Sequence, residues 1–339
     1  MIIVMSHQAS PAHIEAVIEK VKEVGLRPEV SRGEERALIG CIGANAYAYR
    51  EAFAHLPGIQ EIIPITRPFK LASREFRPQD SVVDVDGVLI GGAHPPVMMA
   101  GPCSVEGEAM LLETARFVAA RGARILRGGA FKPRTSPYSF QGLGEEGLKM
   151  LAAAREETGL RVVSEVVSPA EVDLVARFVD MLQVGTRNMQ NYALLQEVGR
   201  AGKPVLLKRG MSSTIEEWLL AAEYVLSQGN RRVVLCERGI RTFEPSTRFT
   251  LDLNAVPAVR EMSHLPVVVD PSQGTGRWSL VTPMSLAAVA AGAHGLIVEV
   301  HPRPDEALSD GGQSLDFATF AALTEQLAAL SAVVGRAAD

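Results

Sequence analysis

Apolar residues follow two different rhythms along this chain of 339 residues. In the first 67 residues, short apolar segments flank a stretch whose apolar positions recur at helical spacing. From residue 97 onward, near-continuous apolar runs alternate with amphipathic stretches. Strands that are apolar on both faces are typical of a parallel sheet covered by helices on both sides. The pattern therefore predicts two α/β domains of different architecture.

Residues 1–67 are expected to form the smaller domain. An apolar strand at 1–5 precedes a helix that begins after Ser10 and Pro11 and ends at Gly25. The other expected elements are strands at 28–31, 36–42 and 59–65 and a second helix at 45–55. The resulting β-α-β-β-α-β order is that of a ferredoxin-like domain. We expect this domain to bind a ligand or a partner, because it holds no cluster of catalytic side chains.

The next segment separates the two domains. Residues 68–80 are polar, contain Pro78 and lack any period, so we interpret them as a linker. The second domain is expected to span 81–339 and to open with a hairpin that turns at Asp86 and Gly87.

Eight strand-helix units make up the second domain. The expected strands are 97–101, 124–129, 161–166, 181–185, 204–210, 232–238, 266–272 and 296–302. Amphipathic stretches such as 108–121, 215–227 and 280–291 lie between them. Eight such units in about 250 residues predict a (β/α)8 TIM barrel. A doubly wound open sheet is the competing interpretation.

Composition excludes several classes of protein. Hydrophobic residues make up 47% of the chain and the net charge is −5, which argues against a general nucleic-acid binder. The apolar stretches are too short to cross a bilayer, and the N-terminus lacks the basic region of a signal peptide. Three cysteines do not make a disulfide framework. We therefore expect a cytoplasmic protein with no membrane segment.

Charged side chains recur at the ends of the expected strands, where TIM barrels place their active sites. Six of them are cations, in a chain that is acidic overall: Arg127, Lys132, Arg134, Arg187, Lys208 and Arg238. The acidic residues there include Glu165, Asp270 and Glu299. Clustered guanidinium and ammonium groups suit phosphate and carboxylate ligands. The pattern predicts a ligand, or a pair of ligands, with at least two anionic groups.

A metal site is expected at the same end of the barrel. Cys103 follows the first barrel strand, and Glu299 and Asp310 belong to the last strand and its loop. One thiolate and two carboxylates suit a divalent transition metal ion.

Two other features must be weighed as signs of different chemistry. Gly142, Gly144 and Gly147 spell G-x-G-x-x-G, but they follow a polar loop rather than a strand, so the dinucleotide-binding meaning does not apply. Lys208 at a barrel mouth is also compatible with a Schiff-base aldolase. The surrounding cations favour a phosphate site equally well.

Seven ordered motifs of the barrel resemble one enzyme family. They are AGPCSVE (100–106), RGGAFKPRTSPYSFQGLG (127–144), QVGTRNMQN (183–191), LLKRGMSST (206–214), ERGIRTFE (237–244), VDPS (269–272) and EVHPRPDEALSDGGQSL (299–315). The chain resembles the 3-deoxy-D-arabino-heptulosonate 7-phosphate (DAHP) synthases, specifically the subgroup with an N-terminal ferredoxin-like regulatory domain. The resemblance implies condensation of phosphoenolpyruvate with erythrose 4-phosphate and water, which releases phosphate. That reaction is the first step of the shikimate pathway, which leads through chorismate to the aromatic amino acids.

The resemblance also implies roles for individual residues. Phosphoenolpyruvate would be held by Arg127, Lys132, Arg187, Lys208 and Arg238. The loop with Lys132, Arg134 and Thr135 would receive erythrose 4-phosphate, and Cys103, Glu299 and Asp310 would hold Mn²⁺ or a similar divalent ion. The catalytic set would be Lys132, Glu165, Cys103 and Asp270, with Glu165 assisting the addition of water.

One position departs from the family pattern. The family's fourth metal ligand is a histidine in a D-P-S-H motif, and this chain has Gln273 there. An amide oxygen is a weaker donor than imidazole, so we expect an active enzyme with reduced metal affinity. His301 is a conceivable replacement, whereas His294 precedes the last strand and belongs to the opposite end.

Two alternative functions stay open at this point. The related 3-deoxy-D-manno-octulosonate 8-phosphate synthases carry a different loop at Lys132 and usually lack the N-terminal domain. A non-catalytic sugar-phosphate sensor is favoured only by Gln273. From the resemblance we also expect an aromatic amino acid as an inhibitor bound by the N-terminal domain, and a homotetramer. Cys41 and Cys236 have no assigned role.

Overall fold

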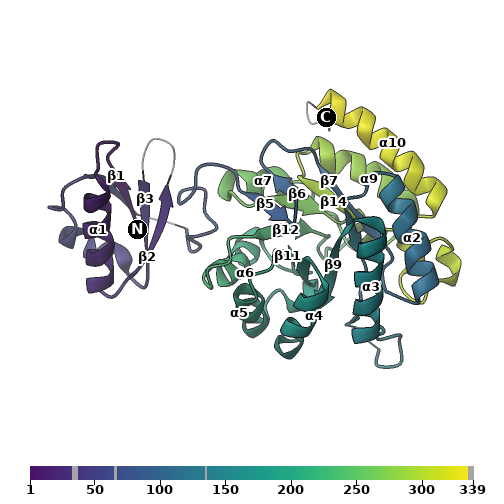
Figure 1. Ribbon diagram of the computed structural model, residues 1–339. Helices are drawn as coiled ribbons and strands as arrows, with labels where there is room; N and C mark the ends of the chain where they lie inside the picture. Colours follow the sequence, from purple (N-terminus) through teal and green to yellow (C-terminus); the bar gives the residue numbers. More distant parts are fainter. Residues whose placement is uncertain (33–36, 65–66, 134–135, 335–339) are drawn as a thin grey trace. The chain divides into compact units, whose positions relative to one another are not determined.

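The computed structural model describes residues 1–32, 37–64, 67–133 and 136–334. It divides into two compact units, Met1–Gln79 and Asp80–Asp339 (Figure 1). Elements of the first unit are β1 (Ile2–Met5), α1 (Pro11–Glu23), β2 (Arg27–Arg32), β3 (Ala37–Ile42), the 3-10 helix η1 (Ala46–Ala52) and β4 (Ile59–Ile63). The strands form an antiparallel sheet in the order β2-β3-β1-β4. The expected ferredoxin-like fold is confirmed.

Helix α1 forms where the sequence predicts it. The Ser10 hydroxyl accepts a hydrogen bond from the His13 backbone N–H at 3.3 Å, and the His13 ring accepts one from Ser10 in return. This capping box satisfies amide groups that would otherwise lack partners at the helix start. The helix then buries Val17 and Val21 against the sheet.

The second helix of this unit differs from the prediction. Residues 46–52 form a 3-10 helix instead of an α-helix over 45–55. Asn45 takes a left-handed conformation and its side chain makes no capping bond. Pro57 follows closely, so the segment is short, and short helical pieces readily adopt i→i+3 hydrogen bonds.

Residues 68–79 group with the first unit. Phe69, Leu71 and Phe76 in this stretch are buried, although its polar composition suggests a linker. The Phe76 ring packs against Gly40 of β3, and the Lys70 ammonium donates a hydrogen bond to the Gly43 carbonyl. Three apolar side chains are enough to anchor a polar segment.

The second unit is the predicted barrel. Its strands are β7 (Val97–Gly101), β8 (Ile125–Arg127), β9 (Arg161–Val166), β10 (Met181–Val184), β11 (Val205–Lys208), β12 (Val233–Glu237), β13 (Val267–Val269) and β14 (Gly295–Glu299). They close into a parallel barrel in sequence order, with β14 beside β7. The larger helices around it include α2 (Glu108–Ala120), α3 (Glu145–Thr158), α4 (Val172–Phe178), α5 (Tyr192–Arg200), α6 (Ile215–Leu226), α7 (Ala255–Met262), α9 (Trp278–Ala290) and α10 (Phe317–Val333) (Figure 1). This closed sheet excludes the doubly wound alternative.

A hairpin fills the amino-terminal end of the barrel. Strands β5 (Val82–Val85) and β6 (Val88–Gly91) are joined at Asp86 and Gly87, both of which have positive φ. Apolar hairpin side chains join the barrel interior in one buried cluster that includes residues of most barrel strands. Over the described residues, no helix is long and apolar enough to cross a membrane.

Candidate active site

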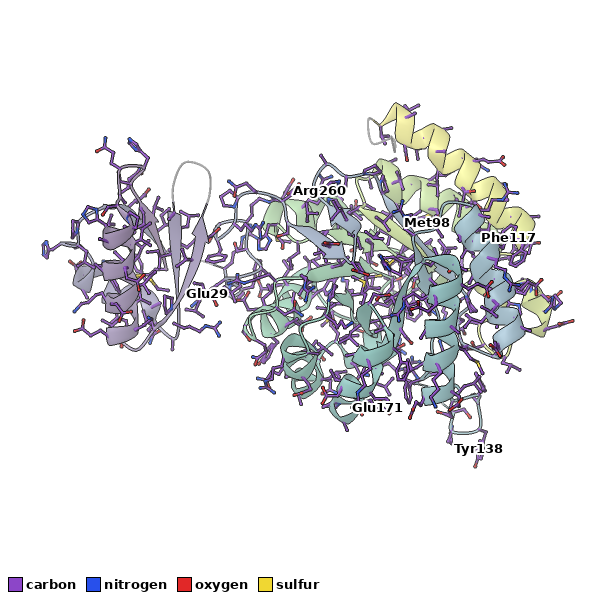
Figure 2. The ribbon with its side chains drawn as sticks, in the orientation of Figure 1. Glu29, Met98, Phe117, Tyr138, Glu171 and Arg260 are labelled. Atoms are coloured by element: carbon purple, nitrogen blue, oxygen red, sulfur yellow. The ribbon has the colours of Figure 1, made fainter. Side chains whose placement is uncertain are left out.

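A cavity of about 250 Å³ opens at the carboxyl ends of the barrel strands. Among the described residues, the cations that line it are Arg127, Lys132, Arg187, Lys208, Arg238 and Arg248. The carboxylates that line it are Glu165 and Asp310. Its wall therefore carries a strong excess of positive charge, which suits an anionic ligand. Tyr138, in the loop after β8, is 96% exposed and points away from the barrel (Figure 2).

Strand geometry decides which charged residues face the cavity. Lys208 and Arg238 line it, whereas their neighbours Arg209 and Glu237 do not belong to its wall. Successive side chains of a strand point to opposite sides. Arg209 instead donates hydrogen bonds to Glu237 at 2.8 Å and to Asp252 at 2.9 Å. This network is structural rather than part of the cavity.

Asp270 lies behind the cavity and holds two groups in place. One carboxylate oxygen accepts from the Lys208 ammonium at 2.5 Å, and the other accepts from the Gln273 backbone N–H at 2.8 Å. The second bond caps the short helix α8 (Pro271–Thr275), which carries Gln273. Asp270 is fully buried, so its charge fixes the direction of Lys208.

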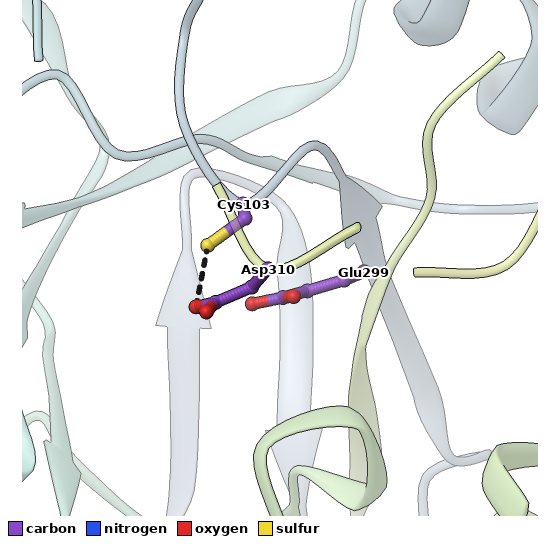
Figure 3. Close-up of side chains that lie close together, drawn as sticks. All are labelled: Cys103, Glu299 and Asp310. Carbon is purple, nitrogen blue, oxygen red and sulfur yellow. Dashed lines mark hydrogen bonds between the residues drawn. The ribbon is translucent and has the colours of Figure 1, made fainter. Parts of the chain in front are cut away.

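Cys103, Glu299 and Asp310 converge from three separate loops and strands (Figure 3). Their potential ligand atoms all lie within 4.8 Å of one another. The Cys103 thiol donates a hydrogen bond to Asp310 at 3.2 Å, and Asp310 has a positive φ of 51°. A thiol and two carboxylates at this spacing fit a divalent metal ion, and no other group of this kind is found among the described residues.

Neighbouring cations set the charge of this group. Burial raises the pKa of the Glu299 carboxyl, but the Arg127 guanidinium and the Lys132 ammonium outweigh it and bring the pKa to about 2. Arg127 donates to Glu299 at 2.7 Å, and the Gln313 amide donates to its other oxygen at 2.9 Å. Burial, with the Glu299 charge, raises the pKa of the Cys103 thiol to about 12. Metal binding there requires loss of the thiol proton.

Hydrogen bonds and one close approach of the backbone bring Lys132 and Cys103 together. The Lys132 ammonium donates to the Cys103 carbonyl and to its sulfur, both at 3.0 Å. Gly101 has a φ of +152°, and a Cβ atom there would lie 2.2 Å from the Arg127 carbonyl oxygen. Only glycine allows the Cys103 loop to pass this close to β8.

Gln273 reaches the metal group through its amide nitrogen. The amide NH₂ donates to Glu299 at 2.9 Å and to Asp310 at 3.4 Å, while its oxygen accepts from Arg238 at 3.0 Å. The amide therefore presents hydrogens, and not the oxygen, to the carboxylates. In this orientation the amide oxygen faces Arg238 rather than the metal group.

Neither His301 nor His294 belongs to the group of Cys103, Glu299 and Asp310. His301 lies 3.5 Å from Glu106 and accepts a hydrogen bond from the Arg303 backbone, so it does not join the metal group. His294 accepts from the Val267 backbone at the start of β13, at the opposite end of the barrel. The expectation that His294 lies at that end is therefore met.

Glu165 lies inside the cavity next to Gly185. A Cβ atom at Gly185 would lie 1.9 Å from a Glu165 carboxylate oxygen, and the Gln183 amide donates to Glu165 at 3.4 Å. Arg187 is exposed and lies at the rim. Arg134 and Thr135, which the sequence places in the substrate loop, lie outside the described residues.

Sequence reasoning missed several cavity residues. Gln183 is a polar residue within the apolar run of β10, which was a usable signal. Arg248 and Ser139 come from long loops rather than strand ends, so the strand pattern gives no indication of them. Gln313 holds Glu299 from a loop far beyond β14.

Comparison with known proteins agrees with this architecture. A model of the DAHP synthetase I family matches residues 72–334, and a model of the DAHP synthase ferredoxin-like domain matches residues 1–67. The chain belongs to the DAHP synthetase I family. A Thermotoga maritima protein named phospho-2-dehydro-3-deoxyheptonate aldolase is 49% identical over 335 residues, covering 99% of both chains. The family membership implied by the sequence resemblance is thus confirmed.

Two solved structures and one more distant relative are also similar to this DAHP synthetase I family member. The crystal structure of the T. maritima protein matches with a TM-score of 0.80 at 48% identity, covering 100% of this chain and 99% of that chain. A truncated form of that synthase matches 80% of this chain at 50% identity, with a TM-score of 0.75. A 2-dehydro-3-deoxyphosphooctonate aldolase from Syntrophotalea carbinolica is 35% identical, and the match covers 96% of that protein but 74% of this chain.

Proposed function

We propose that this chain condenses phosphoenolpyruvate and erythrose 4-phosphate with water to give 3-deoxy-D-arabino-heptulosonate 7-phosphate and phosphate. The observation that carries the proposal is the cation-lined cavity beside the Cys103, Glu299 and Asp310 group in a member of this family. The octulosonate alternative is not favoured, because such relatives match 74% of this chain or less, whereas the heptonate aldolase matches 99%.

The buried cations are the proposed phosphoenolpyruvate site. Arg127, Lys208 and Arg238 are each about 5% exposed. Within the described residues, Arg127 Nε and Arg238 Nε and Nη1 are buried without a hydrogen-bond partner. Unpaired buried donors are costly, so they fit the phosphate and carboxylate oxygens of a ligand. Lys132, whose ammonium bonds Cys103, and the exposed Arg187 complete this set.

The segment that begins at Lys132 is the proposed site for erythrose 4-phosphate. Lys132, Pro133, Ser136 and Ser139 line the cavity and supply a cation and hydroxyl donors, and Ser136 among them is exposed. Arg134 and Thr135 belong to the same segment and are proposed to contact the sugar phosphate. An outer sugar-phosphate site would place its aldehyde above the deeper phosphoenolpyruvate.

The proposed reaction needs two oriented reactants, a water molecule and an acceptor for its proton. C3 of phosphoenolpyruvate forms a bond to the aldehyde carbon, and C2 becomes electron-poor. Water adds at C2 and loses one proton. The bond between C2 and the phosphate oxygen then breaks, as the new C2 hydroxyl passes its proton to the leaving phosphate and becomes the carbonyl of the product. In this proposal Glu165 takes the proton of that water, and Lys132 donates a proton to the growing alkoxide. Fixing two reactants in this way can contribute about 7–11 kcal/mol.

Cys103, Glu299 and Asp310 would hold a divalent ion such as Mn²⁺. When bound, such an ion supplies Lewis-acid polarisation of an oxygen atom. The amide of Gln273 turns its hydrogens toward this group, which supports a weakened metal site. In this proposal Asp270 acts by orienting Lys208 rather than by touching substrate.

We further propose that tyrosine or phenylalanine binds the ferredoxin-like domain and inhibits the barrel of a homotetramer in the cytoplasm. A match over the whole ferredoxin-like domain supports a regulatory role. Deleting residues 1–67 should abolish inhibition and spare turnover. A truncated chain that is still inhibited would contradict the proposal.

The decisive assay measures phosphate release from phosphoenolpyruvate with erythrose 4-phosphate. We expect no turnover after chelation and recovery when Mn²⁺ is added. Arabinose 5-phosphate in place of erythrose 4-phosphate is the matched control, and a preference for it would establish the octulosonate alternative. Tight phosphoenolpyruvate binding without any turnover would instead establish the sensor.

A further inference from the structure

The Gln273 side chain joins the proposed anion site to the metal group. Its oxygen accepts a hydrogen bond from Arg238 Nη2 at 3.0 Å. Its nitrogen donates to Glu299 Oε1 at 2.9 Å and to Asp310 Oδ2 at 3.4 Å. One planar amide thus contacts a cation that lines the cavity and both carboxylates of the metal group.

Chemistry fixes the direction of this amide. A guanidinium has donors only, so Arg238 can bond the Gln273 oxygen but not its NH₂ group. An ionised carboxylate has acceptors only, and both Glu299 oxygens already accept hydrogen bonds, from Arg127 at 2.7 Å and from the Gln313 amide at 2.9 Å. The reverse orientation would set hydrogens against Arg238 and an oxygen against Glu299.

A bound cation reverses this preference. An ion held by Cys103, Glu299 and Asp310 attracts the amide oxygen and repels the NH₂ group. The Gln273 amide must therefore turn or withdraw when a metal binds. Either movement removes the acceptor of Arg238 Nη2, and Arg238 is 5% exposed, so water compensates poorly.

An anion removes that cost. Arg238 Nε and Nη1 are already without partners among the described residues, and its guanidinium lies over the Phe249 ring at 4.2 Å. An anion that accepts a hydrogen bond from Nε or Nη1 can also supply an oxygen acceptor for Nη2, because each of these nitrogens lies beside Nη2 on the guanidinium. Once the anion is bound, the Gln273 amide is free to turn toward the metal group.

We propose that Gln273 couples the two sites, so that metal and anion each favour the binding of the other. The identity of the anion as phosphoenolpyruvate rests on the proposed function. Such coupling is reciprocal, because a ligand that raises the affinity of a second ligand is itself bound more tightly by the same factor. The amide acts as a two-position link and not as a fixed metal ligand.

Plain attraction between a cation and an anion also couples the sites, so variants must separate the two effects. Gln273→Met keeps the length of the side chain but removes both hydrogen-bonding groups, and Gln273→Ala serves as a second variant. Gln190→Met is the matched control, because Gln190 is exposed and lies outside the cavity. Charge attraction is unchanged in all three.

The experiment titrates the full chain, stripped of metal, with Mn²⁺ in the absence and presence of phosphoenolpyruvate. Free Mn²⁺ is followed by electron paramagnetic resonance, with correction for Mn²⁺ bound by phosphoenolpyruvate in solution. In the wild type and in Gln190→Met, phosphoenolpyruvate should raise Mn²⁺ affinity about fivefold more than in Gln273→Met or Gln273→Ala. Phosphoenolpyruvate titrations with and without Mn²⁺ should return the same factor.

A second readout needs no metal. In stripped protein, the phosphoenolpyruvate oxygens compete with the Gln273 oxygen for Arg238 Nη2, so Gln273→Met and Gln273→Ala should bind phosphoenolpyruvate at least as tightly as the wild type. Weaker binding in both variants, or an equal coupling factor in wild type and variants, overturns the inference while leaving the proposed function intact. Phosphoenolpyruvate that fails to bind the wild type under any condition overturns the proposed function and the inference together.

Discussion

Arg209→Met should destabilise the barrel strongly without altering the cavity wall. Arg209 is 4% exposed and donates to Glu237 at 2.8 Å, to Asp252 at 2.9 Å and to the Ser213 carbonyl at 2.9 Å. Glu237 is fully buried, and its other oxygen accepts from the Gly239 backbone. Removing one partner of a buried ion pair costs about 3–5 kcal/mol, which is a large part of a typical stability of about 5–15 kcal/mol.

The loss should grow with pH. Burial raises the pKa of the Glu237 carboxyl, and Arg209 opposes that rise. Without Arg209 the pKa rises further, so the folded state holds a proton that the unfolded state releases. Stability then falls as pH rises above the ordinary glutamate range, by at most about 1.4 kcal/mol per pH unit. Arg209→Met with Glu237→Gln removes the titrating group and should recover most of the loss and flatten the pH dependence.

Tryptophan fluorescence during urea unfolding measures the free energy of unfolding of the barrel at each pH. Both tryptophans of the chain, Trp218 and Trp278, lie in the second unit, so the signal reports the barrel alone. Arg200→Met is the matched control, because Arg200 is exposed and pairs with Glu197 one turn away. It should change the free energy of unfolding by less than about 1 kcal/mol. A similarly small change for Arg209→Met, or a loss that is equal at pH 5.5 and pH 8, would refute the reasoning.

Three further predictions concern the barrel. Lys208→Met should weaken phosphoenolpyruvate binding by about tenfold or more, because a charge-assisted contact contributes about 1.5–3 kcal/mol. An unchanged affinity for phosphoenolpyruvate in calorimetry would argue against a role of Lys208 in binding. Gly185→Ala should slow phosphate release up to about a hundredfold, because its Cβ atom would displace Glu165; wild-type turnover would exclude Glu165. Asp316→Ala should lower the free energy of unfolding by about 1 kcal/mol, because Asp316 caps α10 through the Thr319 N–H at 2.7 Å. That N–H lowers the pKa of Asp316, so the contribution of the carboxylate to stability is present above the ordinary aspartate pKa and is lost as pH falls. Asp316→Asn should keep the cap without this pH dependence. The same loss of stability in acid for the wild type and Asp316→Asn would contradict the role of the carboxylate.

The periodicity of apolar residues was sufficient to predict the barrel. Strands such as β12 are buried at every position, which leaves a parallel sheet covered on both sides as the natural interpretation. The 3-10 helix at 46–52 was not predictable from apolar spacing, because the choice between helix types depends on local capping at Asn45. Residues 68–79 were misleading because three buried apolar side chains outweigh a polar composition.

The site was predictable only in outline. Strand ends and the family resemblance indicated the cations, Lys208 among them, but the sequence did not show that the neighbouring Arg209 turns away from the cavity toward Glu237, since that depends on the phase of the strand. Nor did it show that Gln273 presents hydrogens to the carboxylates, because the direction of an amide follows from its neighbours in space. Arg248 and Gln313 come from loops whose paths no periodic pattern records.

The hairpin of β5 and β6 covers the end of the barrel that lies opposite the cavity. Its apolar side chains fill that amino-terminal end, so among the described residues the cavity opens at the carboxyl ends of the strands. The deepest cations, Arg127 and Lys208, are nearly closed off, whereas Arg187 stands exposed at the rim. With erythrose 4-phosphate in the proposed outer position, a ligand on Arg127 and Lys208 would have to bind first and leave last. In that proposal, the order of binding depends in part on a pair of short strands that contribute no polar group to the cavity.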